Sequence, residues 1–149
     1  MSGTEELPVI LLVSGSSLIH KSISRILKDQ FTVLFAEDAE QAWDVLVREN
    51  SVLVVFSELN KAIDNSAFLE RIRHANHRSI SALPVLLLVS EGDDESLLDK
   101  AFIAGATDYI DLPFSSTELK IRVRLHARIY GEYQENADFE LEQDTPVDL

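Results

Sequence analysis

The chain has 149 residues, of which 46% are hydrophobic and 26% are charged, and it contains no cysteine. This composition is typical of one folded domain and unlike that of a disordered chain, and it excludes disulfides and thiolate chemistry. The longest uncharged apolar stretches are too short to span a bilayer, and the formal charge of −13 disfavours binding to nucleic acid or to an anionic membrane. We therefore expect a cytoplasmic domain with no nucleic-acid or membrane partner.

The first part of the chain alternates apolar runs with amphipathic segments. Residues 9–13 form a continuous apolar run, which is typical of a strand covered on both faces, and apolar side chains at helical spacing follow behind Ser16. Residues 31–36 repeat the strand pattern. Asp38, with Gln41 three residues later, then predicts a capping box at the start of a second helix. Two successive strand–helix units are therefore expected.

The same alternation continues through the rest of the chain. Gly105 is suited to the left-handed cap at the end of a helix, and Ser115 with Glu118 predicts a capping box for a last helix that runs to at least Tyr130. Gly131 costs about 1 kcal/mol relative to alanine inside a helix, so we expect this helix to stop or loosen there. Three further strands are predicted, at residues 52–57, 84–90 and 107–110.

Five strands alternating with five helices predict a doubly wound α/β domain, in which short right-handed crossovers build a parallel sheet with helices on both faces. In such folds the functional site lies beyond the carboxyl ends of the strands. We assign residues 1–130 to this domain. Residues 131–149 carry seven acids and no base, and we interpret them as an acidic linker or C-terminal tail that leads to an output domain.

Several motifs resemble those of one known family. The stretch ALPVLLLVSEGDDESLLDKAFIAGATDYIDLPF, residues 82–114, is similar to the fourth strand through the fifth loop of the response regulator receiver domain (CheY-like). The run VILLV and the segment NSAFLERIR behind Asp64 fit the same family, so the resemblance covers about residues 8–126. It implies a flavodoxin-like, five-stranded parallel sheet in the order 2-1-3-4-5, a cis peptide before Pro113 and a place in two-component signalling.

The resemblance also places the family's functional positions on this sequence. In the family, an acidic pair holds Mg²⁺, an aspartate at the end of the third strand accepts a phosphoryl group from a histidine kinase, and a hydroxyl residue and a lysine hold the phosphate. These positions fall on Ser14 and Gly15, on Ser57, on Val89 and on Leu112. Mg²⁺ normally binds carboxylates, and phosphoryl transfer relies on positioned positive charge. We therefore expect a degenerate pseudo-receiver that is not an enzyme and has no metal or cofactor.

Two nearby acids leave alternatives open. A loop shorter by one residue would place Glu58 at the acceptor position, whereas the ungapped alignment keeps Asp64 in register and favours Ser57. Glu58 could instead imitate a phosphorylated state through its charge, although we expect it to be an exposed loop acid. The alternatives are a conventional receiver with a displaced site at Glu58 or Asp64, and a small-molecule or anion sensor built on residues 14–17 at the start of the first helix.

The remaining predictions concern contacts with other proteins. Tyr109 stands at the position of the family's aromatic switch residue, and Lys120, Arg122 and Arg124 begin a basic stripe suited to an acidic partner. The resemblance implies a homodimer through the helix that ends at Gly105, the strand after it and the last helix. The final PVDL is faintly similar to the start of a diguanylate cyclase (GGDEF) domain, so a second interpretation is a regulatory fragment with a GGDEF output.

Overall fold

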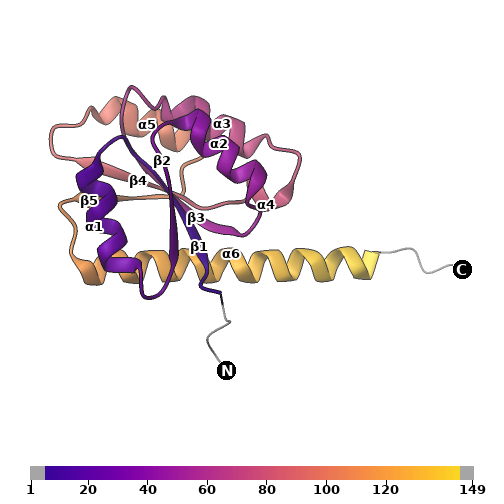
Figure 1. The fold of residues 1–149 in the computed structure, drawn as a ribbon. Helices are drawn as coiled ribbons and strands as arrows, with labels where there is room; N and C mark the ends of the chain where they lie inside the picture. Colours follow the sequence, from indigo (N-terminus) through magenta and orange to yellow (C-terminus); the bar gives the residue numbers. More distant parts are fainter. Residues whose placement is uncertain (1–5, 145–149) are drawn as a thin grey trace, which may run out of the picture.

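The strands of the chain form one parallel sheet (Figure 1). The computed structural model describes residues 6–144, with side chains described for residues 6–135. Within these residues the sheet has five strands in the order β2-β1-β3-β4-β5, which confirms the predicted order. The strands are β1 (Val9–Val13), β2 (Thr32–Ala36), β3 (Val52–Glu58), β4 (Val85–Ser90) and β5 (Asp108–Leu112).

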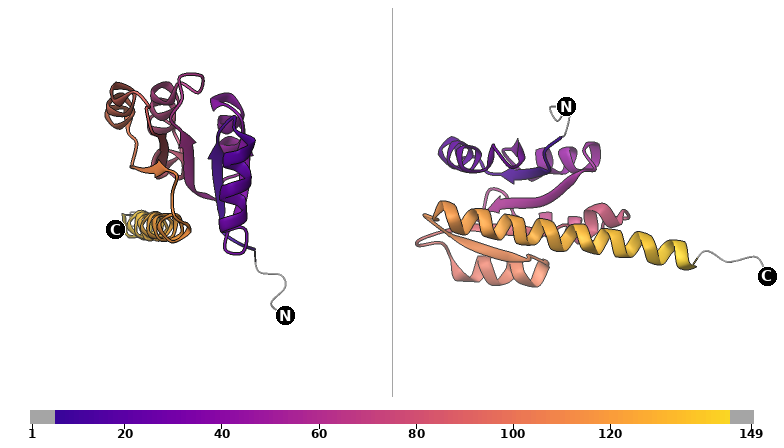
Figure 2. Two further views of the ribbon diagram at one scale, coloured as in Figure 1. Left: turned by 90° about the vertical axis from the view of Figure 1, so that its left-hand side faces the viewer. Right: turned by 90° about the horizontal axis from the view of Figure 1, so that it is seen from below.

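Helices cover both faces of the sheet, because alternate side chains of the central strands point to opposite faces and are apolar on both. One face is covered by α1 and α6 and the other by α2, α3 and α5 (Figure 2). No helix in the described part of the chain is long and apolar enough to cross a membrane. The helices are α1 (Ser17–Leu27), α2 (Ala39–Arg48), α3 (Asn65–Arg73), α4 (Arg78–Ser81), α5 (Glu95–Ala104) and α6 (Ser116–Asp144).

The predicted helix boundaries are largely confirmed by their caps. The side chains of Ser16, Asp38 and Ser115 each accept a hydrogen bond from the backbone amide three residues ahead, at 3.2, 2.9 and 3.0 Å. Gly105 ends α5 with a φ of 121°, a conformation that favours glycine. A Cβ at Gly105 would also lie 2.7 Å from Cγ of Arg73, so this turn requires glycine for space as well.

The last helix is longer than predicted. It continues through Gly131 to Asp144, so the expectation that it stops or loosens at Gly131 is wrong. Just before this glycine, the Tyr130 hydroxyl donates a hydrogen bond to the Ser79 carbonyl at 2.6 Å, which holds α6 against the body of the domain. The short helix α4, which the sequence pattern did not predict, contains only four residues. The division of the chain at residue 130 stays a prediction.

Candidate functional site

The carboxyl ends of β1 and β3 meet where the strand order reverses. Val13 of β1 lies opposite Ser57 of β3 in the register of the sheet. Ser14 follows β1 directly, and Glu58 is the last residue of β3. The chain runs from β1 to β2 on one side and from β3 to β4 on the other. In α/β sheets of this kind, ligands bind in the crevice at such a point. The structure therefore brings together three of the residues that the sequence singled out.

Ser14 is fully buried, and its hydroxyl is used twice. Its Oγ donates a hydrogen bond to Glu58 Oε1 at 2.7 Å and accepts one from the Ser16 amide at 3.0 Å. The Ser14 carbonyl lies 2.6 Å from Nε2 of His20 on α1, and the His20 ring stacks on Phe35 of β2. Ser14 thus connects β1, β3 and α1. No motif in the sequence had indicated His20 as a member of this site.

Asn65, at the start of α3, is a second member of the site that the sequence did not indicate. Its buried Nδ2 donates hydrogen bonds to Ser57 Oγ at 2.8 Å and to the Glu58 carbonyl at 3.0 Å, and its Oδ1 accepts one from the Asn60 amide at 3.0 Å. Ser57 is itself fully buried. Its hydroxyl is therefore held by an amide and is not presented to solvent. The only signal in the sequence was a polar residue directly behind Asp64.

The two candidate acids both have defined contacts. Glu58 is partly buried and accepts the hydrogen bond from Ser14, so the expectation of an exposed loop acid is wrong. The reason is that β3 extends one residue beyond the apolar run and includes Glu58. Asp64 caps α3: its Oδ1 accepts a hydrogen bond from the Ala67 amide at 3.3 Å, and its backbone has a φ of 53°.

Val89 and Leu112 contribute apolar side chains at the carboxyl ends of β4 and β5. Val89 lies near the end of β4 and packs against the core on the α2 and α3 face. Leu112 ends β5 and packs with Phe114 against the core on the α1 and α6 face, where both line a pocket of about 430 Å³. The peptide between Leu112 and Pro113 is cis, as the resemblance implied. Neither position supplies a hydroxyl or an ammonium group.

We call the hydrogen-bonded group of Ser14, Ser57, Glu58 and Asn65 the serine network. It contains one carboxylate, and in the described part of the chain the hydrogen bonds within it involve no Lys or Arg side chain. Gly15 beside it is exposed and has no side chain to offer. Among the described residues no group of three or more potential ligand side chains could hold a metal ion. Mg²⁺ demands an oxygen-rich octahedron with carboxylates, so these residues do not fit it.

The buried polar side-chain atoms of the serine network all have hydrogen-bond partners. The same is true of every buried side-chain nitrogen or oxygen throughout residues 6–135. The Ser57 hydroxyl accepts its hydrogen bond from an amide, and an amide cannot act as the base that a serine nucleophile needs. The arrangement therefore ties the ends of two strands to the starts of two helices.

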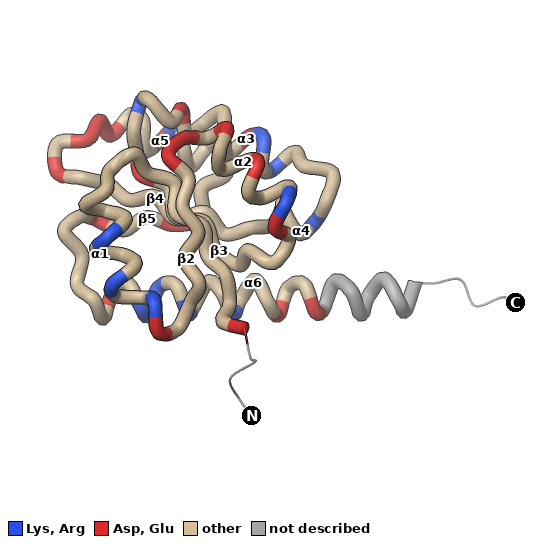
Figure 3. The backbone as a smooth tube through the Cα atoms, in the orientation of Figure 1, with Lys and Arg blue, Asp and Glu red and all other residues tan. Residues whose placement is uncertain are grey.

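The three basic positions singled out on α6 do not form one line. Arg122 forms an ion pair with Asp108 of β5 at 2.7 Å, whereas Arg124 donates a hydrogen bond to Gln30, just after α1, at 3.2 Å. Lys120 is partly buried. Figure 3 shows Lys and Arg on α1 and near the start of α6, and others at α2, α3 and α4. The three basic positions of α6 therefore do not share one environment.

Tyr109 lies at the exposed edge of the sheet. Its ring meets Phe102 of α5 edge-on, with 6.2 Å between the ring centroids. The neighbouring Asp108 is approached by Arg122 and by His126 Nε2, the latter at 3.0 Å. Burial alone would raise the pKa of Asp108, but hydrogen bonds from His126, the Tyr109 amide and Arg122 outweigh it and lower that pKa. Charge and hydrogen bonding therefore fix α6 on β5.

Known proteins share both the sequence pattern and the fold, although no family model matches the sequence. The chain is 28% identical over 128 residues to the response regulator RppA of Synechocystis. This alignment covers 84% of this chain and 53% of that protein. The signal receiver domain of an HD domain-containing protein from Pseudomonas fluorescens superposes with a TM-score of 0.76 at 25% identity, covering 91% of this chain and 97% of that one. A response regulator receiver modulated diguanylate cyclase from Pelobacter carbinolicus gives a TM-score of 0.68 at 19% identity, covering 87% and 99%. The chain spans about half the length of the curated response regulators it matches.

Proposed function

Since this chain belongs to the response regulator receiver family of two-component signalling, we propose that it is a non-catalytic pseudo-receiver. In this proposal it is a cytoplasmic regulatory domain of a bacterial signalling protein. It acts through contacts with an output domain, a partner protein or a second copy of itself, and it needs no aspartyl phosphorylation.

The observation that carries this proposal is the hydrogen bonding of Ser57, which stands at the family's acceptor position. Ser57 is fully buried and accepts a hydrogen bond from Asn65. Phosphoryl transfer also needs positive charge at the transferred oxygens, and here Leu112 stands in place of the lysine. Ser14 and Gly15 supply no carboxylate for Mg²⁺. Acceptor, metal ligands and cation are therefore missing together.

Incubation of the purified chain with radiolabelled acetyl phosphate and Mg²⁺ tests the proposal. We expect no labelled protein, and no change in Tm on adding Mg²⁺ and beryllofluoride, because neither has its ligands. Ser57→Asp restores the acceptor alone and is also expected to stay unlabelled, since Ser14 and Leu112 are unchanged. A receiver with an intact acidic pair serves as the positive control. Stoichiometric labelling of Glu58 or Asp64 in the parent chain would overturn the proposal.

The surface that we propose for protein contacts is formed by α5, β5 and α6. Large apolar side chains from these adjacent elements are exposed to solvent, and such a group is typical of an interaction surface. Tyr109 lies within it, beside the ion pair of Arg122 and Asp108. A homodimer through this surface is the arrangement that we favour. Its exposed apolar side chains are Phe102, Ile103, Tyr109, Ile121 and Leu125.

A receiver that regulates a diguanylate cyclase is a second candidate. Two observations favour it: α6 projects well past the sheet (Figure 1), and a receiver-modulated diguanylate cyclase shares the fold. The full-length gene product, incubated with GTP, is expected to form cyclic di-GMP. Failure of the intact protein to form this product would remove the candidate.

The anion-sensor alternative has less support. At the start of α1, the amide of Ser16 donates to Ser14 Oγ, and the amide of Ile19 donates to Ser16 Oγ. Because these amides already have partners, the turn offers an anion fewer free donors than a helix N-terminus usually does.

A further inference from the structure

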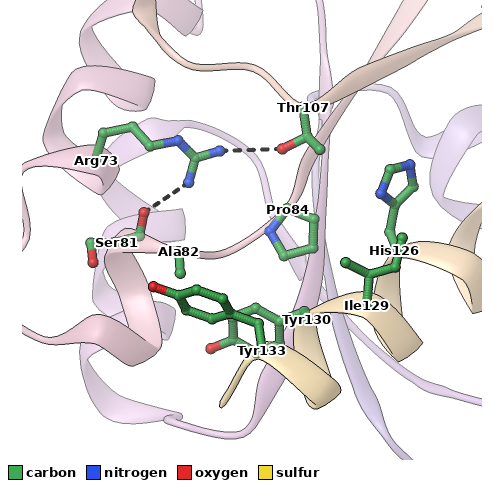
Figure 4. A pocket seen from close by; sticks show the side chains of 9 residues that line it. All are labelled: Arg73, Ser81, Ala82, Pro84, Thr107, His126, Ile129, Tyr130 and Tyr133. Carbon is green, nitrogen blue, oxygen red and sulfur yellow. Dashed lines mark hydrogen bonds between the residues drawn. The ribbon is translucent and has the colours of Figure 1, made fainter. Parts of the chain in front are cut away.

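A pocket of about 410 Å³ lies at the amino ends of the strands, whereas the serine network lies at their carboxyl ends. It is next to the amino ends of β4 and β5 and is closed on one side by α6 (Figure 4). Its size suits a small organic molecule. Its walls include Arg73, Pro84, Thr107, Ile129, Tyr130 and Tyr133.

Arg73 brings a positive charge to this pocket. Its guanidinium donates hydrogen bonds to the carbonyls of Ser81, Leu83 and Gly105, at 3.1, 2.6 and 2.7 Å, and to Thr107 Oγ1 at 3.3 Å. Among the described residues, no carboxylate forms an ion pair with it. Burial lowers the pKa of Arg73, which reflects the cost of keeping this charge partly out of water. A bound anion would supply the missing countercharge.

Aromatic and apolar side chains give the pocket flat walls. The Tyr130 ring is buried, and its hydroxyl donates to the Ser79 carbonyl at 2.6 Å. Burial raises the pKa of Tyr130 to about 12, so the phenol stays neutral near pH 7 and adds no negative charge. Tyr133 and Ile129 are half-exposed on α6, and Pro84 lies across from them. A planar ring would be in contact with apolar surface on both faces.

We propose that this pocket binds a small planar aromatic carboxylate. The ring lies between Pro84 and Tyr133, and the carboxylate faces Arg73 and Thr107. Thr107 Oγ1 already accepts hydrogen bonds from the Val85 amide, at 3.0 Å, and from Arg73. Its own proton is therefore free to be donated to the ligand.

The chemistry of the walls selects this class over an inorganic anion. All five N–H donors of Arg73 point to protein acceptors, so the guanidinium attracts an anion through its charge and not through a fork of new hydrogen bonds. Phosphate or sulfate would lose its water without gaining enough donors. An aromatic carboxylate needs fewer donors and gains apolar burial. Such a ligand would join α6 to the sheet independently of any phosphorylation.

An NMR titration of the full chain with 4-hydroxybenzoate tests the proposal, with 4-hydroxybenzamide as the uncharged isostere. We expect saturable shifts of the backbone amides of Thr107, Ile129 and Tyr133. A Kd of about 0.1–1 mM is realistic for a ligand of about ten heavy atoms. The benzamide is expected to bind at least about tenfold more weakly, because it has no charge for Arg73.

Three variants locate the binding. Ile129→Trp fills the pocket and is expected to abolish the shifts, whereas Val47→Trp, at an exposed site on α2, leaves them unchanged. Thr107→Val removes the donated hydrogen bond and is expected to weaken binding about fivefold to tenfold. The absence of saturable shifts at about 10 mM 4-hydroxybenzoate would overturn the proposal. Equal binding of the benzamide, or binding that Ile129→Trp does not affect, would overturn it as well.

Discussion

Asn65 joins β3, the loop after it and α3 through one buried amide group. Its nitrogen donates to a hydroxyl and a carbonyl, and its oxygen accepts from a backbone amide. Among side chains of this size, only an amide donates and accepts in this way without carrying a charge. Each buried partner left without such a hydrogen bond lowers the free energy of unfolding by about 1–3 kcal/mol. The serine network is therefore a source of stability where an active receiver carries a group of repelling carboxylates.

Replacing Asn65 by alanine tests this stability. Asn65→Ala leaves the Asn60 amide and the Glu58 carbonyl each without a bond, so we expect the free energy of unfolding to fall by about 2–4 kcal/mol. Urea unfolding measures the change. Ser66→Ala, at the next position of the same helix, is the matched control and is expected to stay within about 0.5 kcal/mol of the parent. A loss for Asn65→Ala no larger than that of the control would contradict the role assigned to the network.

The lowered pKa of Asp108 predicts that this residue stabilises the fold in a pH-dependent way. Its pKa is lowered in the folded chain, so its carboxylate stabilises the fold above its unfolded-state pKa of about 4, and this stability is lost as pH falls through the folded pKa. Asp108→Asn is therefore expected to cost stability at neutral pH, by no more than about 1 kcal/mol because solvent screens the pair with Arg122.

Urea unfolding of the parent and of Asp108→Asn across the acidic range gives the comparison. The difference between the two proteins should shrink as the pH falls below about 4 and should be constant above about 6. A difference that is the same at every pH would show that the carboxylate charge contributes nothing to folding.

The sequence indicated where Ser14 and Ser57 lie, but not how they interact. Both lie at strand ends, and strand ends follow from apolar runs and capping residues, which are local signals. The hydrogen bond between Ser14 and Glu58 joins residues 44 positions apart, so no local signal contains it. Asn65 escaped notice for a different reason: its partners are at most eight positions away, but a single polar residue at the start of a helix forms no recognisable motif. Whether the site lacks phosphorylation stays a prediction.

Among the elements, α6 differs most from its sequence-based prediction. Gly131 costs about 1 kcal/mol in a helix, and that local cost predicted an end at this position. The packing of Tyr130 against α4 holds the helix up to the glycine, and a local cost of about 1 kcal/mol is too small to end a helix that is fixed directly before it. The helix α4 was missed because four residues are too few to show a periodic pattern.

Two glycine substitutions with opposite expected effects on stability test the continuity of α6 and the cap of α5. A Cβ at Gly131 would meet nothing within 4 Å, so Gly131→Ala is expected to stabilise the chain by about 0.5–1 kcal/mol. Gly105→Ala is the contrasting variant, because φ is 121° and the new Cβ would lie 2.7 Å from Cγ of Arg73. We expect it to cost about 1 kcal/mol or more. Thermal unfolding followed by circular dichroism compares them; a lower Tm for Gly131→Ala would contradict a continuous α6.

The whole molecule combines a strong negative charge with a localised apolar surface. Two copies that each carry a formal charge of −13 repel one another at low ionic strength. Association therefore depends on apolar contacts, and α5, β5 and α6 present them together. We expect a dimer of this chain to become tighter when moderate salt screens the repulsion.

Sedimentation equilibrium of surface variants tests the homodimer. Ile121 on α6 is 57% exposed within the proposed contact surface, and Leu18 on α1 is 73% exposed outside it. Ile121→Glu is expected to weaken dimerisation at least about tenfold, because it buries a charge in the interface, whereas Leu18→Glu leaves the dimer intact. A parent chain that stays monomeric at high micromolar concentration would remove the homodimer from the proposal.

The continuous backbone of α6 gives the domain a lever arm. At 1.5 Å per residue, the part of the helix from His126, which contacts β5, to Asp144 is about 27 Å long. A swing of about 10° at this contact would carry the far end of the helix through about 5 Å. Small rearrangements around Asp108 would in this way be amplified into a displacement comparable to the diameter of a side chain.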